Sequence, residues 1–246
     1  MNFKNKCVVV LGGTSGIGLR LGITLAELEA DVVAIGRTSR ILADHMPLPT
    51  KIHSYNVDIR KKEDIQEFFK KFNAGEVDVL INCAGIGLFG QFIEMDINDI
   101  EDCMLTNLLG TIIFTQFVAK EMVAKKRGHI VNIESIAAVK GFKYGSIYAA
   151  SKAGLDMFTK VLWDEVKESN VRISSIKPGL INTQFMHKAG MEDFNLEDAL
   201  ATDDIVRSVI FVLSQSETSN VSDVTLRPFA PKGQKLFHEM LDESYG

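Results

Sequence analysis

The N-terminal segment places a glycine-rich turn between an apolar run and an amphipathic stretch. Cys7–Leu11 is a short continuous apolar run, typical of a strand that is covered on both faces. The turn Gly12–Gly18 (GGTSGIG) follows it, and the apolar residues of Ile17–Leu28 recur at helical spacing. Glycines let the backbone approach a pyrophosphate, and a helix N-terminus presents free N–H groups and a positive dipole end. The segment therefore predicts a strand–turn–helix unit that binds the phosphates of a nucleotide, although a turn without a ligand would have the same pattern.

Apolar runs alternate with helical patterns along the rest of the chain. The sequence predicts further strands over Asp31–Ile35, Ile52–Val57, Val77–Ile81, His129–Ile133, Val171–Ile176 and Val221–Leu226. It predicts helices over Lys62–Phe72, Ile97–Lys126, Tyr144–Glu168 and Asp203–Ser214. Because there is no internal repeat or linker, we expect a single α/β domain over residues 1–246, a doubly wound (Rossmann) parallel seven-stranded sheet with helices on both faces. The loop-rich segment 179–204 is expected to be a substrate-binding lid, or a simple surface insertion.

Composition argues against several classes of protein. A chain of 246 residues with 46% hydrophobic and 24% charged residues has the make-up of an ordinary soluble globular protein. The net charge of −5, without a block of Lys and Arg, argues against a nucleic-acid partner. The longest uncharged run, Cys103–Ala119, contains several polar residues, which favours a buried helix over a membrane span.

Neither the cysteines nor the histidines have the spacing of a metal site or a disulfide framework. Cys7, Cys83 and Cys103 are far apart in apolar surroundings, so we expect reduced thiols in a cytoplasmic protein. The five histidines form no His-x-x-x-His pair, and we predict no metal. The N-terminus leads into a strand without a signal-peptide pattern, which favours the same location.

The end of the second strand indicates which dinucleotide is bound. NAD-binding versions of this unit have an acidic residue about 20 positions after the glycines, where it holds the ribose 2′-hydroxyl. Here Gly36 is followed by Arg37 and Thr38, so no carboxylate repels a 2′-phosphate, and a guanidinium and a hydroxyl can bind it. NADP(H) is therefore favoured over NAD(H), unless Arg37 is only an exposed loop arginine. Asp58, after the third strand, is either a partner for the adenine amino group or the N-cap of the next helix.

The candidate catalytic residues follow the strands nearer the C-terminus. Tyr148 and Lys152 lie four residues apart and therefore share one face of a helix, although this spacing also fits a surface helix pair. An ammonium one turn away favours the phenolate and lowers the pKa of a phenol from about 10 toward neutrality. Ser135 can hydrogen-bond a substrate carbonyl oxygen that the tyrosine protonates. Asn107, within an apolar helix, needs partners if buried, and it can bond backbone groups or hold a water.

Together these residues resemble the short-chain dehydrogenase/reductase family over nearly the whole chain. The resemblance is carried by Gly-x-x-x-Gly-Ile-Gly at residues 12–18, Asn-x-Ala-Gly at Asn82–Gly85, Asn107, Ser135, Tyr148-x-x-x-Lys152 and Pro178-Gly179. It implies an NADP(H)-dependent oxidoreductase that interconverts a ketone or other carbonyl and a secondary alcohol by hydride transfer.

The resemblance also implies a role for each matching position. Tyr148 would be the general acid in reduction and the base in oxidation, and Lys152 would lower its pKa and bind the nicotinamide ribose. Ser135 would position the carbonyl oxygen, and Asn107 would hold the water of a proton relay. The predicted cofactor-binding residues are Gly12, Thr14, Ser15, Gly16, Ile17, Gly18, Arg37, Thr38, Asp58, Asn82, Ala84, Gly85, Tyr148, Lys152, Pro178, Gly179 and Thr183.

The sequence departs from the family pattern at several places. Leu11 and Cys83 replace a usual Thr and Asn, and the ending Thr225–Ala230 lacks the Asp-Gly-Gly of many 3-oxoacyl reductases. The alternatives are a 3-oxoacyl reductase, an NAD-dependent 3-hydroxy-acid dehydrogenase, and a nucleotide-sensing or scaffold protein of the same fold.

Two further expectations concern the substrate and the assembly. The predicted pocket segments point to an apolar small-molecule substrate, through Phe89, Phe92, Val139, Phe142, Phe185 and Met186. The helices around Asn107 and Tyr148 have more apolar surface than one sheet face needs. Because family members pair these helices between subunits, the resemblance implies a homodimer or homotetramer.

Overall fold

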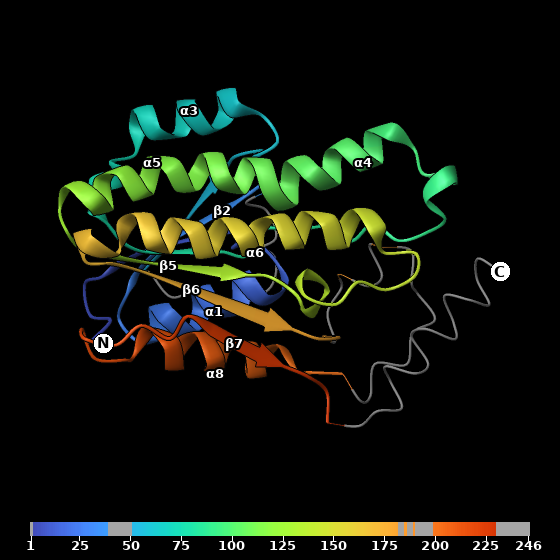
Figure 1. The fold of residues 1–246 in the computed structure, drawn as a ribbon. Helices are drawn as coiled ribbons and strands as arrows, with labels where there is room; N and C mark the ends of the chain where they lie inside the picture. The colour runs from blue at the N-terminus through green and yellow to red at the C-terminus, as the bar shows by residue number, and fades with distance from the viewer. Residues whose placement is uncertain (1, 39–50, 182–184, 186–188, 190–198, 230–246) are drawn as a thin grey trace.

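The computed structural model describes residues 2–38, 51–181, 185, 189 and 199–229 (Figure 1). Within these residues, seven parallel strands form one sheet in the order β3-β2-β1-β4-β5-β6-β7. The strands are β1 (Cys7–Leu11), β2 (Asp31–Gly36), β3 (Ile52–Asn56), β4 (Val77–Asn82), β5 (Gly128–Ile133), β6 (Val171–Pro178) and β7 (Asp223–Leu226). The expected doubly wound parallel sheet is confirmed.

Helices cover both faces of this sheet, as Figure 1 shows. One face carries α1 (Gly16–Glu27) and α8 (Thr202–Leu213). The other face carries α3 (Lys62–Lys71), α4 (Ile97–Met104), α5 (Gly110–Ala124) and α6 (Ser146–Val166). Single 3-10 turns lie at Ala74–Glu76, Phe92–Glu94, Ile136–Ala138 and Lys167–Ser169.

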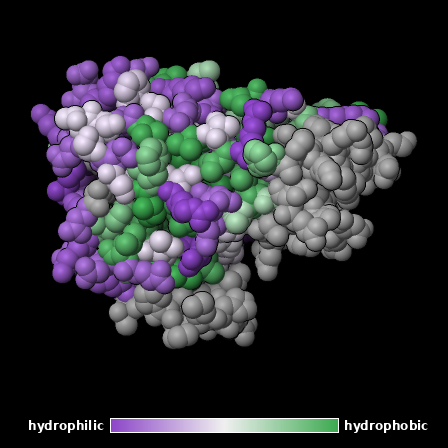
Figure 2. Space-filling view, turned by 90° about the horizontal axis from the view of Figure 1, so that it is seen from below, coloured by the Kyte–Doolittle hydropathy of each residue, from purple (hydrophilic) through white to green (hydrophobic). Residues whose placement is uncertain are grey.

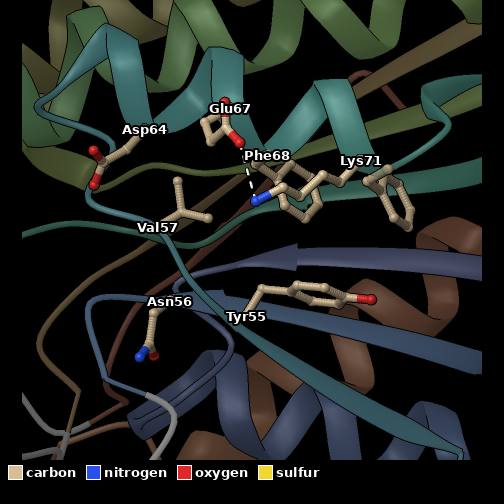
Figure 3. Close-up of a pocket in the computed structure, with 8 residues that line it drawn as sticks. Tyr55, Asn56, Val57, Asp64, Glu67, Phe68 and Lys71 are labelled. Atoms are coloured by element: carbon tan, nitrogen blue, oxygen red, sulfur yellow. Dashed lines mark ion pairs between the residues drawn. The ribbon is translucent and has the colours of Figure 1, made fainter.

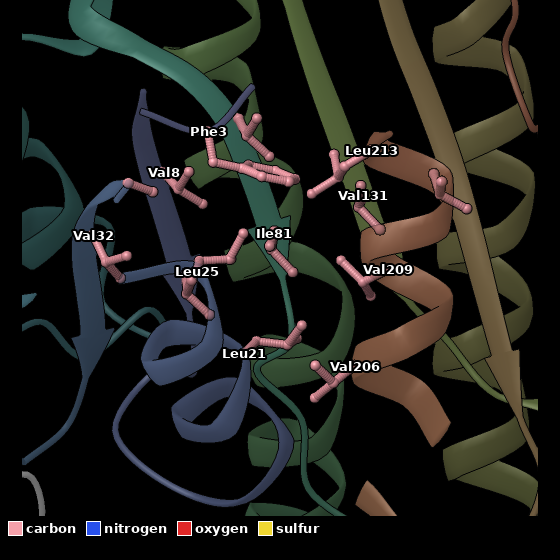
Figure 4. Packing of buried hydrophobic residues seen from close by; sticks show 14 of the residues in the cluster. Phe3, Val8, Leu21, Leu25, Val32, Ile81, Val131, Val206, Val209 and Leu213 are labelled. Carbon is pink, nitrogen blue, oxygen red and sulfur yellow. The ribbon is translucent and has the colours of Figure 1, made fainter. Parts of the chain in front are cut away.

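Each face of the sheet has its own apolar core. On one face, Leu21 of α1 and Val209 of α8 pack with Ile81 of β4 (Figure 4). On the other, α5 contributes Phe114 and Met122, both fully buried. Because the central strands are covered on both sides, they consist of continuous apolar runs rather than alternating ones.

The strand order places a topological switch point beside β1. The chain runs from β1 through β2 to β3 on one side and then crosses to β4 on the other. In open α/β sheets, ligands bind at the carboxyl ends of the strands at such a point. Gly12, directly after β1, lies so close to the end of β4 that a Cβ there would be 2.7 Å from the Ala84 backbone nitrogen. Its φ of 79° also favours glycine, and the absence of a side chain at this residue allows the two strand ends to lie close together.

Two predicted helices have different limits in the structure. The stretch predicted as one helix, Ile97–Lys126, contains a π-helical turn at Leu105–Leu109 and ends at Ala124. The helix predicted from Tyr144 begins at Ser146, because Tyr144 has a φ of 68°, which an L-residue does not adopt inside a helix. The other elements differ from the prediction by one or two residues at their ends.

Within the described residues, the stretch Ile97–Ala124 is long and apolar enough to cross a membrane on length and composition alone. In this fold, however, its Phe114, Val118 and Met122 are fully buried in the core cluster between the sheet and the helices. This packing is that of a core helix.

Candidate active site

Helix α6 places Tyr148 and Lys152 on its buried face. The Tyr148 ring packs edge-on against Phe89, with 5.4 Å between ring centroids, and lies 5.9 Å from the ring of Phe185. The Lys152 ammonium donates a hydrogen bond of 3.1 Å to the carbonyl oxygen of Ile133, the last residue of β5. The end of β5 therefore fixes the lysine ammonium at 6.0 Å from the centre of the tyrosine ring.

Ser135 lies near these two residues and belongs to the segment that follows β5. It is the N-cap of the short turn Ile136–Ala138, and its hydroxyl accepts a hydrogen bond of 3.1 Å from the Ala137 backbone N–H. The same side chain hydrogen-bonds the hydroxyl of Tyr148. The structure thus brings together Ser135, Tyr148 and Lys152, as the sequence predicts.

The protonation of Tyr148 differs from the expectation. Burial raises the pKa of Tyr148 to about 12, and the hydrogen bond with Ser135 only partly opposes this. The Lys152 ammonium lies 6.0 Å from the centre of the tyrosine ring and is not the group that lowers its pKa. Burial also lowers the pKa of Lys152, against the influence of Glu134. Tyr148 is therefore a neutral phenol at pH 7, which suits a proton donor.

Asn107 lies in the π-helical turn between α4 and α5, where its side chain reaches the chain beyond β4. The amide accepts a hydrogen bond from the Ile86 N–H (2.8 Å) and donates one to the Ile86 carbonyl (2.9 Å). It also donates to the Ser151 hydroxyl (3.0 Å), which in turn donates to the Tyr148 carbonyl (2.7 Å). The predicted bonding to backbone groups is confirmed, while the water-holding role stays a prediction.

The glycine-rich turn fits the pyrophosphate of a dinucleotide. Ser15 precedes α1 and makes no side-chain cap, and the first turn of the helix contains no acidic residue. A Cβ at Gly16 would meet nothing within 4 Å, so the space beside the turn is open. Gly18 instead packs directly on the turn, because a Cβ there would be 2.2 Å from the Gly12 carbonyl oxygen. Helix N–H groups beside open space are the features that an anion site requires.

The end of β2 leaves no room for an acidic side chain. A Cβ at Gly36 would lie 2.2 Å from the Thr14 hydroxyl oxygen, so this position requires glycine. Arg37 and Thr38 follow it and are exposed. The Arg37 guanidinium is also close enough to Asp58 to contribute to the lowered pKa of that carboxyl, after the larger effect of Arg60. These groups fit a ribose 2′-phosphate.

Asp58 is not the N-cap of α3, so that alternative is wrong. The N-cap is Lys61, which makes no side-chain capping bond. The carboxylate of Asp58 instead binds Arg60, at 2.9 Å from Nε and 2.6 Å from Nη2. The Arg60 guanidinium thus binds both oxygens of the Asp58 carboxylate, and the same guanidinium also pairs with Asp102 of α4. The proposed contact of Asp58 with adenine stays a prediction.

The remaining predicted residues lie at the carboxyl ends of β4 and β6. The Asn82 side chain is buried and donates hydrogen bonds to Thr115 (2.9 Å) and Asn132 (2.7 Å), so it makes these bonds inside the protein and not at its surface. Gly85 lies beside the predicted catalytic residues, since a Cβ there would be 3.5 Å from the Lys152 ammonium. At the end of β6, Pro178 precedes Gly179, whose N–H donates to the Leu226 carbonyl. Ile17 and Ala84 adjoin the turn and the β4 end, whereas Thr183, Met186 and most of the segment 179–204 lie outside the described residues.

Sequence reasoning missed three residues that lie next to the predicted site residues. Ser151 connects Asn107 to Tyr148, and Arg60 binds Asp58. Glu134 lies buried immediately before Ser135. An acidic residue directly after the apolar run of β5 is a visible signal, whereas the partners of Ser151 and Arg60 depend on the fold.

A separate groove of about 470 Å³ lies between the edge strand β3 and α3 (Figure 3). Tyr55, Phe68 and Phe72 line it, and an ion pair joins Glu67 to Lys71. None of its lining residues is a predicted catalytic residue, so the groove is separate from the candidate active site. No cluster of three or more His, Cys, Asp or Glu side chains in the described ranges could hold a metal ion.

Known proteins are similar to this chain in sequence and in fold. The family model for short chain dehydrogenases matches residues 6–193. An uncharacterized oxidoreductase of Staphylococcus saprophyticus is 32% identical over 235 residues, covering 93% of this chain and 99% of the relative. Two similar solved structures contain NADP. The closed form of a serine dehydrogenase has a TM-score of 0.83 and 26% identity, and the match covers 89% of this chain and 94% of the other. A metagenomic short-chain oxidoreductase has a TM-score of 0.76 and 28% identity, and the match covers 94% of this chain and 100% of the other. The chain belongs to the short chain dehydrogenase family and is an oxidoreductase.

Proposed function

We propose that this protein is an NADP(H)-dependent oxidoreductase that interconverts a carbonyl compound and a secondary alcohol, with Tyr148 as the acid and base. The observation that carries the proposal is the contact of Ser135 with the Tyr148 hydroxyl, one helical turn from the buried ammonium of Lys152. A scaffold or sensor protein would not need a hydroxyl pair and a buried ammonium next to the switch point of the sheet. The test is a panel of alkyl and aryl ketones with NADPH, and secondary alcohols with NADP+, followed through the absorbance of NADPH.

The chain's own residues account for the proton and the orientation. In reduction, the Ser135 hydroxyl donates a hydrogen bond to the substrate carbonyl oxygen, and the neutral phenol of Tyr148 delivers a proton to it. In oxidation, the tyrosine must first lose its proton, which requires alkaline pH because burial raises its pKa. The bond of the Lys152 ammonium to the Ile133 carbonyl keeps the lysine in place on the same buried face of α6 as Tyr148. A nicotinamide dinucleotide, when bound, supplies or accepts the hydride.

The cofactor preference rests on the end of β2. Two similar solved structures hold NADP, and this chain places Arg37 after a glycine that excludes a carboxylate. We expect Arg37→Ala to weaken NADPH binding by about tenfold to a hundredfold and to change NADH binding little, since the guanidinium binds the 2′-phosphate that NADH lacks. Fluorescence titrations of both dinucleotides measure this.

A matched control for Arg37 is Arg172→Ala, at the opposite end of the sheet. Arg172 belongs to the start of β6, and its guanidinium donates a hydrogen bond of 3.3 Å to the Ser216 carbonyl. This variant should bind both dinucleotides as the unmodified protein does. Equal losses of NADPH and NADH affinity in Arg37→Ala would show that the arginine does not recognise the phosphate.

The surroundings of Tyr148 favour an apolar substrate. Phe89 lies against Tyr148 and also against Phe142, at 5.8 Å between ring centroids. Phe185 approaches the tyrosine from the segment after β6. Aromatic rings beside the reacting hydroxyl exclude water and accept the hydrocarbon part of a ketone. We therefore expect the panel to show higher kcat/KM for hydrophobic ketones than for small polar ones.

A second candidate is the dehydrogenation of a 3-hydroxy acid. Serine dehydrogenases are among the solved structures similar to this chain. The panel therefore includes 3-hydroxy acids with NADP+ and with NAD+, and 3-oxoacyl thioesters with NADPH. Preferential turnover of a 3-hydroxy acid would support this candidate over a simple ketone reductase.

We also propose a homodimer or homotetramer. The outer faces of α4 and α6 expose Ile97, Met157 and Val161. On the opposite side of the molecule, seen from below in Figure 2, hydrophobic residues show between hydrophilic ones, and Phe211 of α8 is 55% exposed. Two such faces suit an assembly with more than one interface. The molar mass from light scattering tests this, and a monomer would contradict it.

A further inference from the structure

A buried lysine lies near the carboxyl end of β6, directly before Pro178. Lys177 is only 3% exposed. The residue before it, Ile176, packs into the core that α1 and α8 cover, so Lys177 points to the opposite face of the sheet, where α6 lies. Burial of an ammonium is costly unless opposite charges surround it.

Three carboxylates from three separate parts of the chain surround the Lys177 ammonium. It lies 2.9 Å from a carboxylate oxygen of Asp156 on α6 and 3.8 Å from one of Glu134, which follows β5. It also contacts Asp223, the first residue of β7. Asp156 in turn binds Lys160, one turn further along α6, at 2.6 Å. Lys177 is therefore the common partner of α6, the end of β5 and β7.

Asp156 belongs to the row of α6 residues that contains the predicted catalytic pair. Tyr148, Lys152 and Asp156 are spaced four residues apart, so they lie on one face of the helix, and all three are buried. Tyr148 contacts Ser135, and Lys152 donates to the Ile133 carbonyl at 3.1 Å. Each member of the row is thus bound to the carboxyl end of a strand, the first two at β5 and the third at β6.

The end of β5 is attached to the same place. Glu134 lies between Ile133 and Ser135, the two residues that contact the catalytic pair. Its backbone N–H donates a hydrogen bond of 2.8 Å to the Ile176 carbonyl of β6, and its carboxylate accepts one of 2.8 Å from the Thr159 hydroxyl of α6. A displacement of α6 along the sheet would therefore break the ion pairs at the end of β6 and the contacts of the catalytic pair together.

We propose that Lys177 is a positioning residue of the candidate active site: by binding Asp156 and Glu134, its ammonium fixes α6 against the end of β5, so that the Tyr148 hydroxyl meets Ser135. Lys177 acts through these residues and has no direct part in the chemistry. A buried ion pair stabilises a fold little more than apolar residues of the same volume, but it fixes the distance between the elements that it joins. The inference rests on the proposed function and adds a residue that supports it.

The test compares Lys177→Met with the unmodified protein. Methionine keeps an unbranched apolar side chain and removes the ammonium. The protein is labelled with fluorotyrosine, and the 19F signal of Tyr148 is assigned by its absence in Tyr148→Phe. Ser135→Ala gives the signal of a Tyr148 that has lost its partner. We expect the Tyr148 signal in Lys177→Met to move toward its position in Ser135→Ala, and an unmoved signal would overturn the proposal.

A second variant breaks the same attachment from the side of α6. Asp156→Ala removes the carboxylate but leaves Lys177 paired with Asp223 and Glu134, so the ammonium remains compensated. This variant serves as the test if Lys177→Met does not fold. The Tyr148 signal should move in the same direction, because α6 again loses its attachment to β6. A signal at its original position would contradict the proposal.

The matched control is Lys125→Met, at the opposite end of the sheet. Lys125 is also partly buried, and its ammonium donates a hydrogen bond of 2.9 Å to the Gly75 carbonyl, close to the start of β4. Its loss should lower the thermal stability without moving the Tyr148 signal. A similar movement of the signal in Lys125→Met would show that the signal reports loosened packing, and the proposal would fail.

Kinetics provide a second readout. Lys177→Met should lower kcat by about tenfold to a hundredfold and leave NADPH affinity nearly unchanged, because displacement of reacting groups by about 1 Å has effects of this size. In the Ser135→Ala background the same substitution should cause little further loss, since the contact that it supports is already absent. A full additional loss in the double variant would show that Lys177 does not act through the Ser135–Tyr148 contact.

The 19F measurement needs no substrate and is therefore independent of the proposed reaction. If the Tyr148 signal moves in Lys177→Met but the unmodified protein turns over no carbonyl compound or alcohol, the positioning role stands and the proposed function fails. If turnover is present and the signal does not move, the function stands and Lys177 has no positioning role.

Discussion

Tyr148→Phe is expected to lower kcat by about a hundredfold to ten-thousandfold, the range that a positioned acid contributes, and to leave NADPH affinity almost unchanged. The substitution removes only the hydroxyl that bonds Ser135. The ring keeps its contacts with Phe89 and Phe185, so the fold and the neighbouring Lys152 are preserved. Single-turnover rates with the best ketone of the panel, together with NADPH titrations, measure the two effects separately.

The control is Tyr55→Phe, which removes a hydroxyl from a tyrosine of β3 that is 41% exposed in the groove beside α3. Its kcat should equal that of the unmodified protein. A near-normal rate in Tyr148→Phe would remove the tyrosine from its role. The pH profile adds a second criterion: oxidation should accelerate toward alkaline pH in the unmodified protein, because the raised pKa keeps the phenol protonated at neutrality, and this acceleration should be absent without the hydroxyl.

The parts of the fold that depend on local pattern could be predicted from the sequence. The buried strands of the sheet centre are continuous apolar runs, and helices such as Lys62–Lys71 have amphipathic spacing, so their existence and nearly all of their limits were predicted. The parallel direction of the strands was also predicted, since strands and helices alternate along the chain. The catalytic set was predicted through its fixed spacing on α6 and through the family resemblance.

What could not be predicted depends on contacts between distant residues. Asn107 was expected to bond backbone groups, but neither the π-helical turn in which it lies nor its partner Ile86 could be predicted from residue spacing. The partner of Asp58 was also not predicted, since Arg60 binds both of its carboxylate oxygens. The pKa of Tyr148 depends on how deeply α6 buries it, which the order of residues does not give. Pattern thus identified the reacting groups, whereas their protonation and support required the packed structure.

Gly18→Ala is expected to reduce the affinity for NADPH by about tenfold or more and to destabilise the fold by about 1–3 kcal/mol. A Cβ at this position would lie 2.2 Å from the Gly12 carbonyl oxygen and 2.8 Å from its carbonyl carbon. These are backbone atoms of a turn already held against Ala84, so they cannot move aside without displacing the end of β1. The start of α1 must retreat instead, which carries its free N–H groups away from the phosphate position. Thermal denaturation and NADPH fluorescence measure the two losses.

Gly22→Ala provides the matched control within the same helix. Its Cβ would meet only the Val32 side chain, at 3.5 Å, which is ordinary van der Waals contact. Since alanine is favoured over glycine inside a helix by about 1 kcal/mol, this variant should be as stable as the unmodified protein or more stable. If Gly18→Ala behaved like Gly22→Ala, the close packing of α1 on the turn would not be what positions the phosphate site. A loss confined to Gly18→Ala would show that α1 binds the dinucleotide because a missing side chain allows its first turn to rest on the end of β1.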